Sequence, residues 1–315
     1  MIKTALILGR NNGVGLDRDA SLLAEALTDL GVEVKCPRLK SLRDGLSRDY
    51  QADVAFHLER MAPCWWQRKA KTHYLIPNQE RFPKRLIGKL ARIDTVMCKS
   101  LHAEAIFAQL HPRVTYIGFT SEDRHLANAT PDDQRFFHLA GRSTLKNTSL
   151  LLELWNQHPE WPTLTLVQHP ENAPPEVPPN VTLVDRYLPD AELKILQNAH
   201  GIHLCPSLSE GWGHYIVEAM SCGAVVLATD APPMNELVTR ARGIIVPFSQ
   251  TEPRHLGFNY FADPQALENA ITRIITMTTK EKRDLGAEAK SWFVKNHSSF
   301  KSRLAQILQI PVKLL

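Results

Sequence analysis

The chain has 315 residues, a formal net charge of +4 at pH 7 and five cysteines. This length suits two domains of ordinary size, each with its own hydrophobic core, and the modest charge gives no indication of nucleic-acid binding. The cysteines lack C-x-x-C spacing, so we expect buried thiols in a reducing, cytoplasmic environment. No apolar run approaches the length of a membrane-spanning helix, and any membrane contact is expected to be peripheral.

The charge is unevenly distributed along the chain. Residues 1–119 carry 19 Lys and Arg against 12 Asp and Glu, so the remainder is net negative. Two explanations fit a basic N-terminal half: it faces an anionic acceptor or a membrane surface, or it is a solvated basic face.

Strands and helices alternate through the first half, which is typical of a doubly wound α/β domain. Residues 4–8 form the first predicted strand, and a loop with Gly13 and Gly15 leads to a helix at 20–30 with Asp19 as its N-cap. His57 ends the third predicted strand, where functional residues collect in such sheets, but a structural role is the commoner one for a histidine after a strand. The remaining predictions are strands at 32–37, 53–57, 72–77, 95–98 and 114–118, a basic amphipathic helix at 81–93 and a helix at 101–110.

A second α/β domain begins after a polar linker. We expect domains at 1–119 and 135–282, the linker at 120–134 and a helical tail at 283–315. After the strand at 136–140, Arg142 and Lys146 lie four residues apart in a strand-to-helix turn, where both cations can reach one diphosphate. The other predictions are strands at 163–168, 181–184, 202–205, 224–229 and 243–247, and helices at 149–157, 191–199, 215–222, 264–278 and 280–308.

The segment PSLSEGWGHYIVEAM, residues 206–220, joins a predicted strand to a predicted helix. Gly211, Trp212 and Gly213 form a tight loop whose backbone N–H groups, with the positive end of the helix dipole, favour phosphate. Glu210 and Glu218 flank this loop. Carboxylates only accept hydrogen bonds, so sugar hydroxyls suit them. The alternative is a solvated loop acid and an exposed helix acid.

Glu210 and Glu218, with AMSCG and AVVLAT following at residues 219–229, resemble the E-x7-E signature of family-4-like retaining glycosyltransferases. That family has the GT-B fold, an α/β architecture of two Rossmann-like domains facing across a cleft. The resemblance is strong over residues 137–247 and rests on layout elsewhere. It implies transfer of a sugar from a nucleotide-sugar donor to a glycan, lipid-linked or other acceptor, with retention of the anomeric configuration.

The resemblance also assigns roles to single residues. It implies that Arg142, Lys146 and the amides of residues 211–213 bind the diphosphate, that Glu210 binds the donor sugar and that Glu218 binds the ribose. It places Gly13 and Gly15 near the donor phosphates, with Asn11 and Asn12 where the family has tandem glycines. It further implies a helical tail that crosses back to the N-terminal domain.

Two more positions follow from the same resemblance. Tyr187 and Leu188 would lie beside the base, although Tyr187 fits a packing role equally well. His57 would lie near the donor sugar, as a candidate catalytic residue beside Glu210 and the diphosphate-binding cations.

Catalysis in such an enzyme would come from groups that stabilise the leaving diphosphate. The sequence has no Asp-x-Asp pair after a strand end and no His/Cys cluster with ligand spacing, so no metal and no other cofactor is expected. Two alternatives stay open. One is a catalytically silent nucleotide-sugar-binding module, and the other is an epimerase or an inverting transferase of the same fold.

Overall fold

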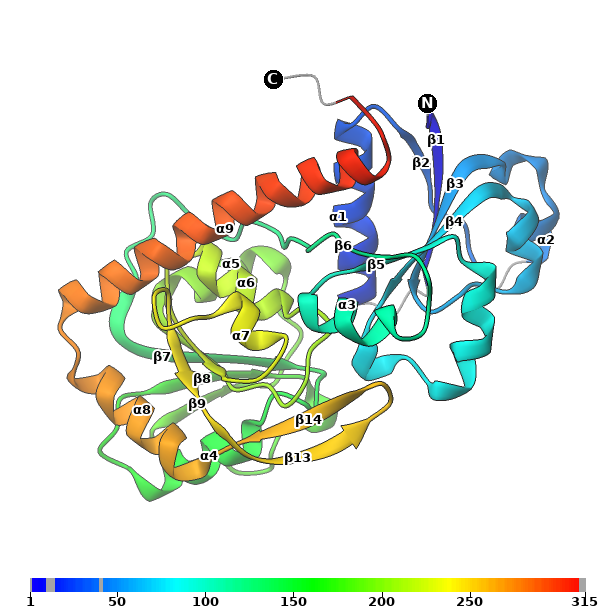
Figure 1. The fold of residues 1–315 in the computed structure, drawn as a ribbon. Coiled ribbons are helices and arrows are strands. Elements are labelled where there is room, and N and C mark those ends of the chain that lie inside the picture. The colour runs from blue at the N-terminus through cyan, green and yellow to red at the C-terminus, as the bar shows by residue number, and fades with distance from the viewer. Residues whose placement is uncertain (1, 10–14, 40–41, 312–315) are drawn as a thin grey trace. The chain divides into compact units, whose positions relative to one another are not determined.

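The structure is a computed structural model that describes residues 2–9, 15–39 and 42–311. The chain divides into two compact units, whose elements are labelled in Figure 1. Unit 1 comprises Met1–Ser121, Pro253–Gly257 and Asn296–Leu315, and unit 2 comprises Glu122–Glu252 and Phe258–Lys295. Each unit therefore gathers separate stretches of the sequence.

Unit 1 is built on a parallel six-stranded sheet with strand order β2-β1-β3-β4-β5-β6. Its strands are apolar because helices and loops cover the sheet, and Leu6, Ala55 and Trp66 share one of its buried clusters. The direction in which successive strands are added to the sheet reverses between β1 and β3. At this point Leu8 of β1 pairs with His57 of β3. The elements are β1 (Thr4–Leu8), α1 (Gly15–Asp29), β2 (Glu33–Lys35), α2 (Leu42–Leu46), β3 (Ala52–Glu59), β4 (Ala70–Pro77), β5 (Thr95–Cys98), α3 (Leu101–Ala108) and β6 (Val114–Tyr116).

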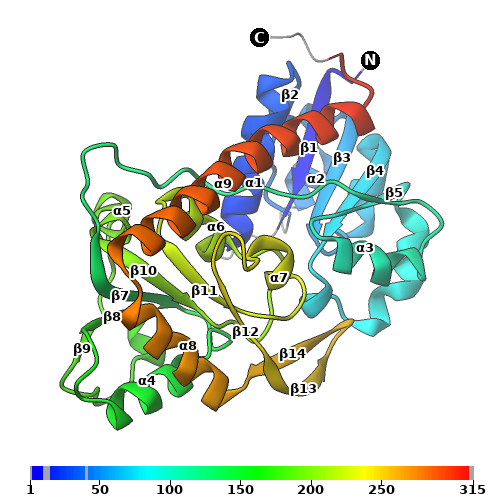
Figure 2. The same cartoon turned by 60° about the vertical axis from the view of Figure 1, so that its left-hand side comes forward.

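Unit 2 contains a second parallel sheet, with strand order β12-β11-β10-β7-β8-β9 (Figures 1 and 2). β7 lies in the middle, with β8 on one side and β10 on the other. Phe136 and Trp155 pack edge to face in the core beside this strand. The elements are β7 (Asp132–Gly141), α4 (Thr148–Gln157), β8 (Leu164–Gln168), β9 (Val181–Val184), α5 (Asp190–Ala199), β10 (His200–Cys205), α6 (His214–Ser221), β11 (Val225–Thr229), α7 (Met234–Leu237), β12 (Ile244–Val246) and α8 (Pro264–Thr276).

Two further elements complete the chain. β13 (Phe248–Arg254) and β14 (Gly257–Ala262) form a two-stranded ribbon, and α9 (Thr279–Ile307) is a helix of 29 residues. In unit 2, Lys282 donates to the Asp133 carbonyl at 2.8 Å. In unit 1, Asn296 donates to the Phe119 carbonyl at 2.7 Å. Side-chain bonds to main-chain carbonyls thus anchor both parts of this helix.

The strands at 4–8, 95–98 and 181–184 are confirmed to the residue. The helix predicted at 81–93 is wrong in type: Lys84–Arg92 is a 3-10 helix, and Gly88 at its centre disfavours an α-helix. Asp19 is not the N-cap of the first helix, because α1 already begins at Gly15 and the Asp19 carboxylate is buried against Lys99 at 2.5 Å.

Cys36 and Cys64 are exposed rather than buried. The β13–β14 ribbon was not predicted, since β13 is mostly exposed and polar.

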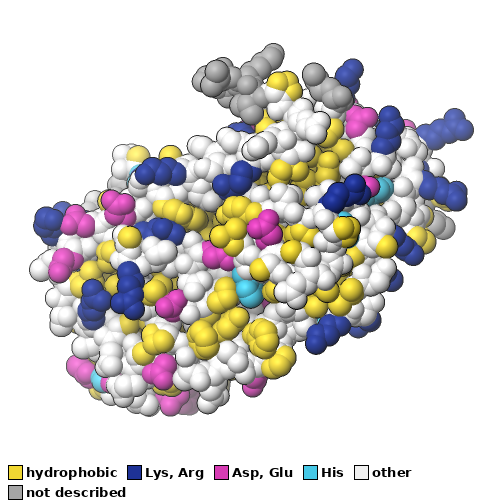
Figure 3. Space-filling view, viewed as in Figure 1, with side chains coloured by type: hydrophobic (Ala, Val, Ile, Leu, Met, Phe, Trp, Pro, Cys, Tyr) yellow, Lys and Arg dark blue, Asp and Glu magenta, His cyan; other side chains and the backbone are white. Residues whose placement is uncertain are grey.

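Among the described residues, no helix combines the length and the apolar character needed to cross a bilayer. On the face shown in Figure 3, hydrophobic side chains form small groups separated by charged and other polar ones.

Candidate functional site

The chain order of unit 2 reverses between β7 and β10, and the loops that follow these strands therefore meet. The strands pair through Phe136 with Ile202 and through Phe137 with His203. The backbone N–H of Leu208 donates to the Leu145 carbonyl at 2.9 Å, which joins the two loops directly. On its other side, the Leu208 carbonyl accepts from the N–H of Tyr260 on β14 at 2.8 Å. Open α/β sheets bind ligands at such a reversal, beyond the carboxyl ends of the strands.

Lys146 and Glu210 form an ion pair between these loops, and each side chain is only 13% exposed. The Lys146 ammonium also lies 3.5 Å from the centre of the Tyr215 ring. Cation–ring contacts add to the attraction that holds a lysine in place. The structure thus brings together the cation and the carboxylate that the sequence assigned to one site.

The Glu210 carboxylate is also held by hydroxyl groups. Burial raises the pKa of the Tyr215 phenol well above its ordinary value, so this hydroxyl keeps its proton and donates to the Ser207 oxygen at 2.5 Å. The Ser207 hydroxyl in turn donates to Oε1 of Glu210 at 2.5 Å. This chain of donors fixes the direction of the Glu210 carboxylate.

The turn before α6 requires glycine at residue 213. Gly213 has a φ of +102°, and a Cβ there would lie 3.1 Å from Ile216 Cδ1 and 3.2 Å from Leu237 Cδ1. The turn directs the N-terminus of α6, with its positive dipole end, towards the loop of residues 211–213. Gly211 and Trp212 are buried in that loop. This is the geometry expected of a phosphate-binding helix start.

Arg142 lies on the β7 loop but is less enclosed than Lys146. Its side chain is 55% exposed, and its Nε lies 4.0 Å from Glu171 Oε2. The loop ends at Asn147, which has a left-handed φ of +59° and precedes α4. Glycine adopts this left-handed conformation more readily than other residues, and asparagine tolerates it.

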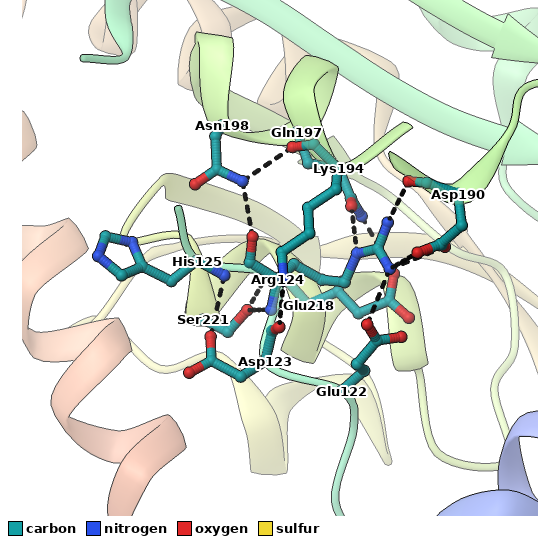
Figure 4. Close-up of polar contacts among 10 residues, drawn as sticks. All are labelled: Glu122, Asp123, Arg124, His125, Asp190, Lys194, Gln197, Asn198, Glu218 and Ser221. Atoms are coloured by element: carbon teal, nitrogen blue, oxygen red, sulfur yellow. Dashed lines mark hydrogen bonds and ion pairs between the residues drawn. The ribbon is translucent and has the colours of Figure 1, made fainter. Parts of the chain in front are cut away.

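Glu218 is fully buried on α6, so the interpretation as an exposed helix acid is wrong. Gln197 Nε2 donates to Glu218 Oε2 at 3.1 Å, and Arg124 Nε donates to Gln197 Oε1 at 2.8 Å (Figure 4). The Arg124 guanidinium contacts Asp190 at 2.8 and 2.9 Å. Burial acts to lower the pKa of Arg124, but Asp190, Glu218 and Glu122 outweigh it and raise that pKa. The buried carboxylate of Glu218 is therefore balanced by a buried cation.

The other predicted positions have varied surroundings. Tyr187 is 85% exposed, so the interpretation as a packing residue is wrong, and Leu188 is half-buried. Their assignment to the base stays a prediction. Gly15 is the first residue of α1, whereas Gly13 lies outside the described residues.

His57 is buried in the sheet of unit 1 with both ring nitrogens bonded. The Ala62 N–H donates to Nδ1 at 2.9 Å, so Nε2 carries the proton and donates to His73 Nδ1 at 3.0 Å. His73 Nε2 then donates to the Gln67 carbonyl at 3.1 Å. Burial, with a smaller effect of His73, lowers the pKa of His57 to about 3. These contacts favour the structural interpretation of His57 over the catalytic one.

Four residues of the site were missed in the sequence: Ser207, Tyr215, Arg124 and Gln197. Ser207 stands three residues before Glu210, a spacing that places a hydroxyl within reach of the carboxylate. Nothing in the spacing of Arg124, Gln197 and Glu218 indicates their contact. Within residues 2–9, 15–39 and 42–311, no three His, Cys, Asp or Glu side chains gather in a group able to hold a metal ion.

Residues 177–292 match the protein-family model described as Glycosyl transferases group 1. No curated protein sequence matches the chain. Among solved structures, a glycosyltransferase from Rickettsia africae ESF-5 is similar, with a TM-score of 0.74 and 13% identity, over 98% of each chain. A sucrose-phosphate synthase from Thermosynechococcus elongatus has a TM-score of 0.74 and 18% identity, again over 98% of each chain.

A third similar structure is HepE of Anabaena in complex with UDP-glucose, with a TM-score of 0.72 and 14% identity, over 98% of this chain and 100% of that one. These likenesses, with the two parallel six-stranded sheets, confirm the predicted α/β fold of the GT-B type with two Rossmann-like domains. Residues 177–292 are thus similar to group 1 glycosyltransferases, and the chain as a whole has the GT-B fold.

Proposed function

We propose that the protein transfers a sugar from a nucleotide-sugar donor to an acceptor, with retention of the anomeric configuration and without a metal ion or other cofactor. The contact between Lys146 and Glu210 carries this proposal, because it combines a cation for the diphosphate with a carboxylate for sugar hydroxyls at the β7–β10 reversal. The similar HepE structure is a complex with UDP-glucose, which supports the choice of donor class.

Lys146 would stabilise the charge that develops on the leaving group. When the bond between the anomeric carbon and the diphosphate oxygen breaks, its electron pair stays with the diphosphate. An ammonium has three N–H donors, so Lys146 can bind a phosphate oxygen and keep its contact with Glu210. Arg142, the amides of residues 211–213 and the start of α6 would add to this stabilisation.

Glu210 would accept hydrogen bonds from hydroxyls of the donor sugar. Its attachment to Ser207 and Lys146 fixes the carboxylate before the sugar binds, so little ordering is needed during the reaction. In a retaining transfer, the acceptor hydroxyl attacks from the face that the diphosphate leaves, and its proton passes to the departing phosphate oxygen. Retention itself is inferred from the resemblance of Glu210 and Glu218 to the E-x7-E signature.

Glu218 would accept hydrogen bonds from the ribose hydroxyls. Because this carboxylate is fully buried, the role requires a local opening beside α6 when the nucleotide binds. Tyr187 and Leu188 would lie beside the base. We place this activity in the cytoplasm, with a glycan, a lipid-linked molecule or another compound as acceptor.

Thermal unfolding with UDP, GDP, ADP and their common sugars tests the binding step. A ligand that binds only the folded protein raises its melting temperature according to the ratio of ligand concentration to Kd. Absence of a shift with every nucleotide would contradict the proposed function.

The chemistry is tested by nucleotide release with the preferred donor. Release of nucleoside diphosphate that requires an acceptor supports a transferase, and binding without release supports a silent binding module. The anomeric proton coupling of the product separates retention from inversion. We expect turnover to survive exhaustive treatment with EDTA, because cations and N–H groups bind the diphosphate. Loss of turnover that magnesium or manganese restores would contradict the metal-free site.

A further inference from the structure

Unit 1 carries its own concentration of polar side chains. Arg60 directly follows β3, and the 3-10 helices Gln79–Arg81 and Lys84–Arg92 follow β4. The ribbon turn Pro253–Gly257 belongs to the same unit, and the Leu256 N–H donates to the Gln79 carbonyl at 3.2 Å. These segments meet beyond the carboxyl ends of parallel strands, where α/β sheets place their ligands.

The segments line an open pocket of about 350 Å³. Its lining consists of Pro83, Lys84, Arg85, Pro253 and His255. His255 has a left-handed φ of +53°, an unusual conformation for a residue with a side chain, and such conformations concentrate at functional sites. Pro83 and Pro253 have a fixed backbone φ. They therefore restrict the backbone next to the cationic residues Lys84 and Arg254.

The charge in and around this pocket is strongly positive. Arg60 Nε lies 3.2 Å from the Glu59 carboxylate, and Arg81 Nε lies 3.8 Å from that of Glu80. By contrast, Lys84, Arg85 and Arg254 have no ion-pair partner among the described residues.

Arg254 adds a buried donor to this excess of charge. Its Nε is inaccessible to solvent and has no hydrogen-bond partner within the described part of the chain. Burial lowers the pKa of His255, and the positive charges of Arg254, Arg60, Arg81 and Arg85 lower it further. These four guanidinium groups therefore all lie close enough to affect this histidine. A buried donor without a partner costs free energy that an anionic ligand can offset.

We propose that this pocket binds a phosphoryl group carried by the acceptor, which makes the acceptor of this protein an anionic, phosphate-bearing molecule. The inference rests on the proposed transferase function and names the substrate class of its acceptor side. Three cations without partners suit a dianion better than a single carboxylate. The planar donor forks of Arg85 and Arg254 match phosphate oxygens in pairs.

The phosphoryl group can be part of a soluble sugar phosphate or of a lipid headgroup. Glucose 1-phosphate serves as the soluble probe, and vesicles of phosphatidylcholine with one fifth phosphatidic acid serve as the membrane probe. Binding of each probe is measured by calorimetry or co-sedimentation with the 315-residue protein saturated with its preferred nucleoside diphosphate, so that the nucleotide site is occupied.

The double variant Lys84→Ala/Arg85→Ala removes two cations of the pocket lining, and Arg254→Ala removes the cation between the lining residues Pro253 and His255. Lys89→Ala/Arg92→Ala is the matched control, because it removes the same charge from exposed positions of the same 3-10 helix outside the pocket lining. We expect each pocket variant to weaken probe binding by about tenfold or more. The control should change it by less than about twofold, since Lys89 and Arg92 lie outside the pocket lining and solvent screens their charges from a ligand bound there.

Pocket-dependent binding of glucose 1-phosphate supports a soluble acceptor, and pocket-dependent binding of the vesicles alone supports a lipid-borne one. Equal losses in the pocket variants and the control would show a non-specific basic face and overturn the proposal. Binding of neither probe would overturn it as well. The thermal shifts with UDP, GDP and ADP are recorded on the same protein preparations: their absence with all three nucleotides in the unchanged protein contradicts the transferase, whereas a nucleotide shift without phosphate binding contradicts only the pocket.

Discussion

The Lys146 ammonium and the Glu210 carboxylate pair directly, although 64 residues separate them in the sequence. Each is mostly shielded from solvent, so the attraction is screened less than in a surface pair. The pair sets the distance between the ammonium and the carboxylate that we propose for the diphosphate and the sugar before any ligand binds. Its two members should therefore contribute to different parts of donor binding.

Replacement of Lys146 by alanine should weaken nucleoside diphosphate binding by about 1.5 to 3 kcal/mol, the usual contribution of a charge-assisted hydrogen bond. Arg142→Ala should cost less, because its side chain is half exposed and solvent screens its charge. Isothermal titration with the preferred nucleotide measures both changes. Lys280→Ala, which removes an exposed cation paired with Asp284, is the control. Unchanged affinity in both site variants would remove the proposed diphosphate site.

The two glutamates should separate nucleotide binding from turnover. Glu218→Ala should weaken the bare nucleotide and the nucleotide sugar alike, by roughly one or two charged hydrogen bonds. Glu210→Gln should leave bare nucleotide affinity nearly intact and lower kcat, because the sugar is no longer held in line with the departing phosphate.

Titrations and initial rates for both glutamate variants decide this prediction. Since Glu218 is buried beside Arg124, its variant also needs a melting temperature, which shows whether a lower affinity reflects partial unfolding. Equal losses of bare nucleotide affinity in the two variants would mean that the roles inferred from the resemblance are wrong.

Gly213→Ala should lower both stability and nucleotide affinity. The new methyl group would meet Ile216 and Leu237 at 3.1 and 3.2 Å, in a backbone conformation that alanine rarely adopts. We expect a loss of about 1 to 3 kcal/mol in unfolding free energy, the usual cost of such strain. Gly88→Ala is the control, since a Cβ there meets nothing within 4 Å and φ is not positive. Similar melting temperatures for the two variants would contradict a strained turn at Gly213.

The stability of the fold should fall as the pH falls below about 6.5. Burial lowers the pKa values of His57 to about 3 and of His138 and His203 to about 4, so these rings stay neutral in the fold but gain a proton when it unfolds. These histidines contribute fully to the free energy of unfolding above pH 6.5, about the pKa of histidine in the unfolded chain. That contribution is lost as the pH falls towards their pKa values in the folded protein. By linkage, each buried ring should cost about 2 kcal/mol between pH 7 and pH 5.

Urea unfolding at pH 7 and pH 5 measures this dependence. His57→Asn should reduce the difference in unfolding free energy between pH 7 and pH 5 by about 2 kcal/mol, the contribution of one buried histidine. His158→Asn should not reduce it, because hydrogen bonding to Glu160 raises the pKa of that half-buried histidine. An unchanged pH dependence in the His57 variant would show that its pKa is not lowered in the fold.

The fold could be predicted because its strands are short apolar runs between glycine, proline and polar turns. Lys146 and Glu210 could be assigned to one site for the same reason, since each follows a predicted strand and such strand ends meet at one edge. The contact of Arg124 with Gln197 and of Gln197 with Glu218 could not, because it depends on side chains from three separate segments. The ribbon β13–β14 also escaped prediction, because its polar, exposed residues lack the alternation of a half-buried strand.

The pairing of β7 with β10 has a consequence for the order in which the protein acquires its binding capacity. His200 pairs with Asp132, and the whole of β8 and β9 lies between these two strands in the sequence. Bringing β7 and β10 together closes a long loop, which costs chain entropy that is offset only when the sheet is complete. Such non-local contacts form slowly. A chain emerging from the ribosome carries Lys146 long before the segment with Glu210 and α6 is made. Nucleotide capture during refolding should therefore lag behind the growth of helical signal and report the moment at which the central strands of unit 2 join.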